Sequence, residues 1–133
     1  MGAWSYEPFG NDTANDWAYD LSEAKDLSYI EKALDNVLEQ GSSYLEAPMA
    51  EEAIGAIEVL AKLLGRGTQS DSYTEKVDSW VESMDKKPTT ALLEKAQLVI
   101  SRILSKDSEL VEEWQDSSDW RSSMARLSAA IRA

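Results

Sequence analysis

The segment from Pro48 to Leu64 constrains the fold most, because it is apolar on nearly every side of a helix. Its two apolar faces are formed by Ala50, Ala53, Ile54, Ile57, Ala61 and Leu64, and by Ala56, Val59, Leu60 and Leu63. A helix that is apolar on most sides usually lies at the centre of a fold and touches several neighbours. We therefore expect a central helix surrounded by others.

A narrow polar stripe runs along this central helix, formed by Glu51, Gly55, Glu58 and Lys62. Glu58 and Lys62 have the spacing of an exposed ion pair on a helix surface. A glycine inside a helix costs about 1 kcal/mol relative to alanine. Gly55 therefore predicts the close approach of a neighbouring element.

Helical periodicity recurs along the rest of the chain, whereas no segment alternates apolar and polar residues as a half-buried strand does. Further helices are predicted from Asn11 or Asp12 to 21, from 26 or 28 to 40, over 73–84, from 89 or 90 to 104, and from Ser108 onward, with a break near 117–118. Short links favour antiparallel neighbours. The fold class is thus predicted as all-α: one compact domain over residues 1–133, with about six mostly antiparallel helices.

Residues 1–11 are irregular but rich in aromatic side chains, with Trp4, Tyr6 and Phe9 in a short stretch. A flexible tail seldom has this composition. We expect the segment to be ordered and packed over the helices, although the three rings could instead form a hydrophobic docking patch. Trp17, Trp80, Trp114 and Trp120 are predicted to be core residues.

The chain contains no cysteine and no histidine. This excludes disulfides, thiolate sites, catalytic triads with histidine and the commonest transition-metal ligand. Phosphate-binding loops and EF-hand spacing are also absent from the sequence. We therefore expect no enzyme activity and no cofactor. No apolar run is long enough to span a membrane, and no secretory signal is recognisable, so a cytoplasmic protein is expected.

The net charge of −12 is concentrated in one half of the chain. Residues 1–58 contain 13 acidic and two basic residues, for a net charge of −11. Such a field repels nucleic acid and anionic lipid and attracts a basic protein. The proposed binding residues are Asp12, Asp16, Glu46, Glu51 and Glu52. Alternatively, the acidic residues serve solubility alone.

Two other functions remain open from the sequence. Asp12, Asp16 and Asp20 lie at helical spacing and could bind Mg²⁺ or Ca²⁺ together with Glu51, Glu52 or Glu58. The alternative for this row is that Asp12 caps the helix while the others are solvated. The amphipathic C-terminal helix could also join copies of the chain into a homo-oligomer.

The N-terminal motif resembles a bacterial family defined by a domain of unknown function, number 4259. That family opens with Met-Gly-Ala-Trp and continues with Asn-Asp-x-Ala-x-Asp-Trp, represented here by Asn11, Asp12, Ala14, Asp16 and Trp17. Similarity continues through 44–48 and 53–61, and then at Ser108, Glu109 and Leu110 together with Trp114. The resemblance implies a cytoplasmic, helical bacterial protein and implies no activity. By analogy, small acidic proteins of this kind are candidate immunity or antitoxin-like inhibitors of a basic partner.

Overall fold

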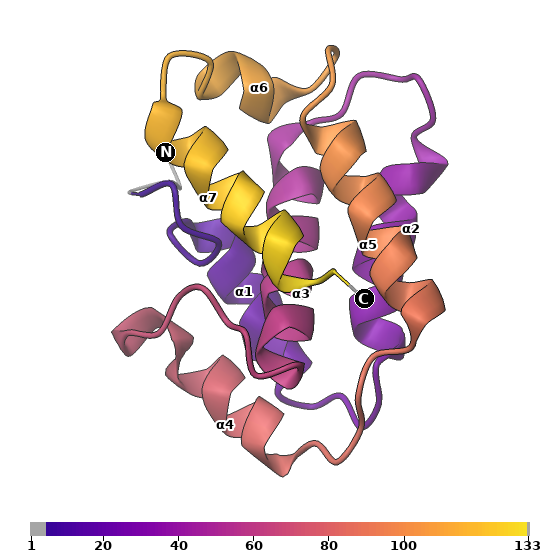
Figure 1. Ribbon diagram of the computed structural model, residues 1–133, viewed down its shortest axis with the longest axis vertical. Helices are drawn as coiled ribbons and strands as arrows, with labels where there is room; N and C mark the ends of the chain where they lie inside the picture. Colours follow the sequence, from indigo (N-terminus) through magenta and orange to yellow (C-terminus); the bar gives the residue numbers. More distant parts are fainter. Residues whose placement is uncertain (1–4, 133) are drawn as a thin grey trace.

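The computed structural model describes residues 5–132 of the chain, and this part contains seven α-helices (Figure 1). They are α1 (Asp12–Leu21), α2 (Ser28–Glu39), α3 (Ala47–Leu63), α4 (Glu75–Ser83), α5 (Thr90–Ile103), α6 (Glu109–Glu113) and α7 (Ser118–Ala130), with a 3-10 turn η1 (Ser72–Thr74) before α4. The described residues contain no strand, and one isolated bridge joins Leu45 to Ser108. The prediction of an all-α bundle is confirmed.

Helix α3 lies at the centre of the bundle and packs against α1, α2, α4, α5, α6 and α7. Both α2 and α5 run antiparallel to it (Figure 1). Its apolar residues Ala53, Ile57, Val59 and Leu60 are fully or almost fully buried. The numerous alanines allow the neighbouring helices to approach closely, as the apolar pattern on nearly all sides predicts.

Polar residues set the ends of several helices. The Asn11 Oδ1 atom accepts a hydrogen bond from the Ala14 N–H at 2.7 Å, so Asn11 is the N-cap of α1. Asp12 is the first helical residue rather than the cap, and its side chain is exposed. Gly41 follows α2 at a φ of 57°, a left-handed conformation that glycine adopts without steric cost.

The N-terminal segment is ordered over its described residues. Phe9 and Pro8 are buried, whereas the Tyr6 side chain is 37% exposed. Phe9 lies against Gly55 of α3, which confirms the predicted close approach to this glycine. Trp4 lies outside the described residues.

The C-terminal part forms two helices, α6 and α7, where the sequence pattern indicates one interrupted helix. The Ser117 Oγ atom accepts a hydrogen bond from the Trp120 N–H at 3.1 Å and starts α7. Trp120 is buried, as are Trp17 and Trp80, but the prediction for Trp114 needs correction because it is half-buried at the end of α6. In the described part of the chain, no helix has the length and apolar character needed to cross a membrane.

Candidate functional site

The five predicted binding residues lie on α1 and around the start of α3. Asp12, Asp16 and Glu46 are exposed, while Glu51 and Glu52 are half-buried. Helices α1 and α3 pack against each other. The fold therefore brings together two acidic segments that are about 30 residues apart in the sequence.

Helix α6 adds acidic residues that the sequence reasoning missed. Burial raises the pKa of Glu51, and the nearby charges of Glu113 and Glu109 raise it further, whereas a hydrogen bond with Thr13 of α1 lowers it. Burial and the charge of Glu109 likewise raise the pKa of Glu113. The negative charges of Glu109 and Glu113 on α6 therefore act on Glu51 of α3, which is also linked to Thr13 of α1.

The site continues along α1 toward Asp20. Burial raises the pKa of Glu52, and the charge of Asp20 adds to the effect. Asp20 is exposed and lies one helical turn beyond Asp16. We call the resulting surface the acidic face, and it consists of Asp12, Asp16, Asp20, Glu46, Glu51, Glu52, Glu109 and Glu113.

Hydrogen bonds between the segment before α3 and the start of α6 fix one edge of the acidic face. The Glu109 Oε1 atom accepts a hydrogen bond from the Ala47 N–H at 2.8 Å. The Tyr44 hydroxyl donates to Glu112 Oε1 at 2.7 Å, and this interaction is the main reason that the pKa of Tyr44 rises to about 12. The backbone of Leu45 bonds to both Asp107 and Glu109. These links explain how α6, which has five residues, is held beside α3.

The acidic face has no ion pairs within the described part of the chain. The ion pairs found there join Lys62 to Glu58 and Asp78, and Lys95 to Glu31 and Asp35. None of these acids belongs to the acidic face. Its carboxylates are therefore not joined to any described basic residue at ion-pair distance, which leaves them available to a cation or a basic partner.

Glu58 and Lys62 do not form the exposed pair that the polar stripe predicts. Glu58 is fully buried, and the Lys62 side chain is only 7% exposed. Lys62 Nζ lies 3.9 Å from Glu58 Oε2 and 2.7 Å from Asp78 Oδ1 on α4. The prediction fails because the loop after α3 folds back over this side of the helix, and that return depends on tertiary contacts.

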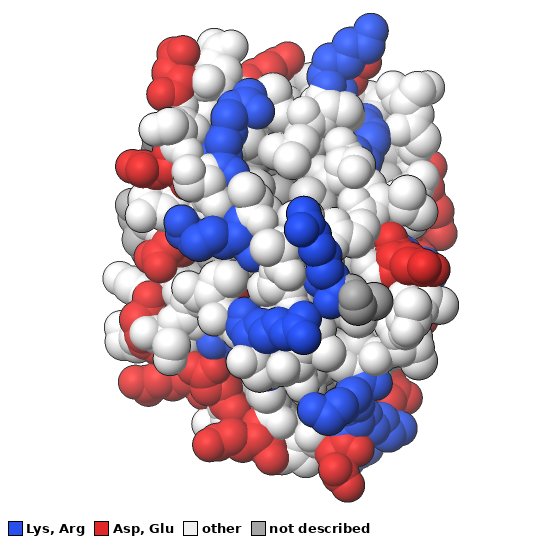
Figure 2. All heavy atoms as spheres, in the orientation of Figure 1, with Lys and Arg blue, Asp and Glu red and all other residues white. Residues whose placement is uncertain are grey.

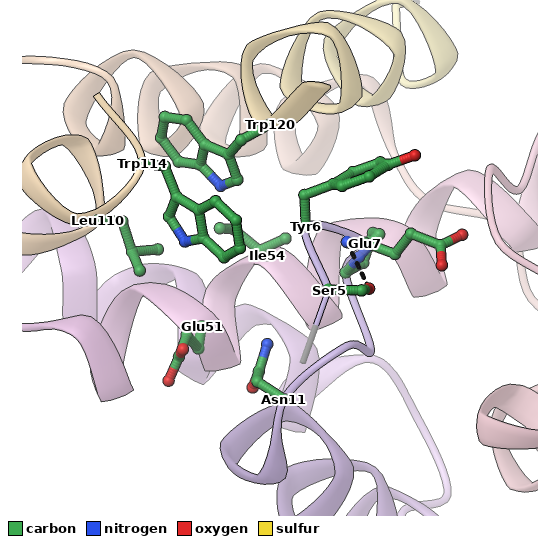
Figure 3. A pocket seen from close by; sticks show the side chains of 10 residues that line it. Ser5, Tyr6, Glu7, Asn11, Glu51, Ile54, Leu110, Trp114 and Trp120 are labelled. Atoms are coloured by element: carbon green, nitrogen blue, oxygen red, sulfur yellow. Dashed lines mark hydrogen bonds between the residues drawn. The ribbon is translucent and has the colours of Figure 1, made fainter. Parts of the chain in front are cut away.

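A small pocket lies beside the acidic face, beneath the N-terminal segment (Figure 3). Its lining includes Ile54, Leu110, Trp114 and Trp120 on one side, Tyr6 on the other, and Glu51 at its edge. Its free volume is about 20 Å³, which is enough for about one water molecule. The pocket is too small for an organic ligand in the conformation described.

Basic residues collect on another face of the molecule. Figure 2 shows Lys and Arg over the middle of the face that carries α5 and α7, with Asp and Glu mainly toward its edges. Arg121 and Arg126 of α7 are exposed, as are Arg66 and Arg132. This face therefore differs from the acidic face in carrying exposed basic residues.

The acidic face is a negatively charged surface. Its groups are carboxylates, which accept hydrogen bonds and attract cations but provide no strong nucleophile. The described residues contain no group of three or more Asp or Glu side chains arranged to hold a metal ion. The predicted row of Asp12, Asp16 and Asp20 therefore does not form such a group with the glutamates of α3.

Comparison with known proteins supports the resemblance in the N-terminal motif. No curated protein and no solved structure matches the chain significantly. One family model, described as "Domain of unknown function (DUF4259)", matches residues 2–125 of the 133 residues. Because this match covers nearly the whole chain, the protein belongs to the DUF4259 family.

Proposed function

We propose that the protein is a cytoplasmic interaction module whose acidic face binds a basic protein, in the manner of an immunity or antitoxin-like inhibitor. The observation that carries the proposal is that the acidic face has no ion pairs within the described part of the chain, although its carboxylates lie close enough to raise the pKa of Glu51 and Glu113. Burial is the larger cause of both shifts, and mutual repulsion adds to it. A bound Lys or Arg would relieve this repulsion.

The exposed arginines of α7 would give the proposed complex an orientation. An acidic surface accelerates the encounter with a basic partner and fixes the direction of approach. Exposed Arg121 and Arg126 on the α7 face would repel the same partner. The partner would therefore contact α1, the start of α3 and α6, rather than α7.

The absence of cysteine is consistent with a reducing cytoplasm. Charged complexes of this kind weaken as salt screens their fields. Inhibitors that cover a basic cleft need no catalytic groups of their own, so the carboxylate chemistry of the acidic face is sufficient for this function.

The proposal can be tested by affinity capture from a lysate of the source organism, followed by mass spectrometry. The test variant replaces three exposed residues of the acidic face, as Asp12→Lys, Asp16→Lys and Glu46→Lys. A matched control makes the same charge change on α4, the following loop and α5, as Glu82→Lys, Asp85→Lys and Glu94→Lys, all at exposed positions.

We expect the wild type and the control to capture the same basic protein in a stoichiometric and salt-sensitive manner, and the test variant to lose it. Association measured with that purified partner should slow more than tenfold in the test variant. Equal capture by the test variant, or no stoichiometric basic protein with any of the three, would refute the proposed function.

A further inference from the structure

A buried carboxylate organises the loop that follows α3. Glu58 accepts hydrogen bonds from the Thr68 N–H at 2.7 Å, the Thr68 hydroxyl at 2.6 Å and the Gln69 N–H at 2.8 Å. Lys62 lies on the same side of α3 and also binds the Gln69 carbonyl and Asp78. Gln69 is therefore fixed from two directions by charged side chains.

Gln69 is also hydrogen-bonded to the N-terminal segment and so connects this segment to Glu58. Its side chain is 3% exposed, and its Oε1 atom accepts a hydrogen bond from the Phe9 N–H at 2.8 Å. The other end of the side chain donates to Asp71 Oδ2 at 3.0 Å. Glu58 and Phe9 are 49 residues apart in the sequence but are joined through one glutamine.

Residues 5–10 form a strap that is tied to the rest of the protein by the buried ring of Phe9 and by few hydrogen bonds. Within the described part of the chain, two hydrogen bonds leave the strap: the Phe9 N–H donates to Gln69, and the Phe9 carbonyl accepts from Asn15 Nδ2 at 2.9 Å. The bonds of Ser5 and Gly10 remain inside the strap. The polar attachment of the strap is therefore concentrated on one residue.

The strap covers the small pocket described above. Figure 3 shows Ser5, Tyr6 and Glu7 on one side of this pocket and the rings of Trp114 and Trp120 on the other. Several lining residues of the strap are polar, and free space remains between the two sides. Movement of the strap would uncover Ile54 and Trp120 beside Glu51, where the acidic face begins.

We propose that the strap opens and closes over the Trp114–Trp120 pocket and that Glu58, acting through Gln69, holds it closed. A buried charge is costly, and replacement of a buried ion pair by apolar residues is often neutral or stabilising. A role in fixing the strap would explain the buried charge of Glu58 by a function other than stability. This movement of the strap is proposed for the free protein, and it does not depend on whether the acidic face binds a basic partner.

Hydrogen exchange of single backbone amides, measured by NMR on the full chain, tests the connection. Glu58→Gln removes the charge and places an amide donor against the N–H groups of residues 68 and 69. Glu31→Gln is the control, because it makes the same chemical change in a half-exposed ion pair between α2 and α5.

In Glu58→Gln, we expect the amides of Phe9, Thr68 and Gln69 to exchange at least about tenfold faster, as loss of a buried hydrogen bond implies. The amide of Val99 in α5 should keep its wild-type rate, and Glu31→Gln should leave all of residues 5–10 unchanged. Faster exchange at Thr68 and Gln69 with no change at Phe9 would overturn the proposal.

Glu58→Gln could also destabilise the whole protein and accelerate every amide. Gln69→Ala then decides the question, because it removes the acceptor of the Phe9 N–H and keeps the charge of Glu58. Faster exchange at Phe9 with normal exchange at Val99 supports the proposal. A wild-type rate at Phe9 refutes it.

Opening of the strap can be followed by acrylamide quenching of the Trp120 fluorescence. The contribution of Trp120 is obtained by subtracting the signal of the same protein with Trp120→Phe. Trp120 is 3% exposed in the closed protein. We expect Gln69→Ala to increase its quenching at least twofold, and Glu31→Gln to have no effect. Unchanged quenching in Gln69→Ala would show that the strap stays over the pocket and would overturn the gating role.

Discussion

The ring of Phe9 packs directly on the backbone of Gly55 in the middle of α3. A Cβ atom at position 55 would lie 3.2 Å from Phe9 Cε1 and 3.5 Å from the Ala14 Cβ atom. The helix accepts a glycine at a cost of about 1 kcal/mol. Burial of a phenylalanine side chain offsets this cost with roughly 1.5–3 kcal/mol.

Gly55→Val should destabilise the protein by about 1–3 kcal/mol, because the added methyl groups meet Phe9 and Ala14 in a packed interior. The midpoint of urea unfolding measures the effect. Ser101→Val, at an exposed position of α5, is the control and should change stability by less than about 0.5 kcal/mol. Equal effects of the two substitutions would contradict the close contact.

Lys62→Met and Lys95→Met should differ strongly in stability, although each removes a lysine with two acidic partners. Lys62 is 7% exposed and its loss leaves buried Glu58 without a cation, so we expect a cost of about 3–5 kcal/mol. The partners of Lys95 are 47% and 41% exposed, and loss of such a pair costs less than about 1 kcal/mol. Chemical denaturation of both variants provides the comparison, and similar costs would argue against a special role of burial.

Stability should increase as the pH falls from 7 toward 4.5. The folded protein raises the pKa of Glu51, Glu52, Glu58 and Glu113 above the ordinary value of 4.5, mainly through burial. The folded state therefore binds more protons than the unfolded state in this range, and the stabilisation is lost as the pH rises through the raised pKa values. Asp26 acts in the opposite direction, because hydrogen bonds from Ser28 lower its pKa.

Melting temperatures across this pH range would test the prediction. The double variant Glu51→Gln and Glu113→Gln should show a weaker pH dependence than the wild type, since two of the raised groups are gone. A melting temperature that falls steadily from pH 7 to 4.5 would contradict the predicted sign.

Tyr44 should ionise later than an ordinary tyrosine. Its hydroxyl donates to Glu112, and this bond together with the neighbouring carboxylates raises its pKa to about 12. Titration of tyrosinate absorbance, compared with a Tyr44→Phe variant, isolates this group. Glu112→Gln should return its pKa toward 10, whereas Glu82→Gln on α4 should not change it.

Local signals in the sequence predict most helices of this protein. Apolar residues at helical spacing identify the helices, Asn11 and Thr89 are strong N-caps, and Gly41 marks the end of α2. These signals depend on interactions within a few residues, so they can be recognised without any knowledge of the fold. The central place of α3 also follows, because a helix that is apolar on nearly all sides needs neighbours on all of them.

The acidic face is only partly determined by the sequence. The excess of acidic residues in the first half points to α1 and α3, but nothing local connects Glu109 and Glu113 with Glu51. That connection requires the hydrogen bonds from Ala47 and Tyr44 to α6, which join segments more than 60 residues apart. The acidic face is therefore larger than the set of five residues predicted from the sequence.

The helices, the buried apolar faces and the acidic half of this protein can be predicted from local patterns, because periodicity, capping and charge are properties of short segments. Long-range packing, in contrast, buries Glu58 and Lys62, leaves Trp114 half-buried and places Phe9 on Gly55. From the sequence alone, a polar residue on a helix is expected to be exposed. A loop that is distant in the sequence can nevertheless cover it and supply its hydrogen bonds. Thr68 and Gln69 do so for Glu58, and no pattern within α3 reveals them.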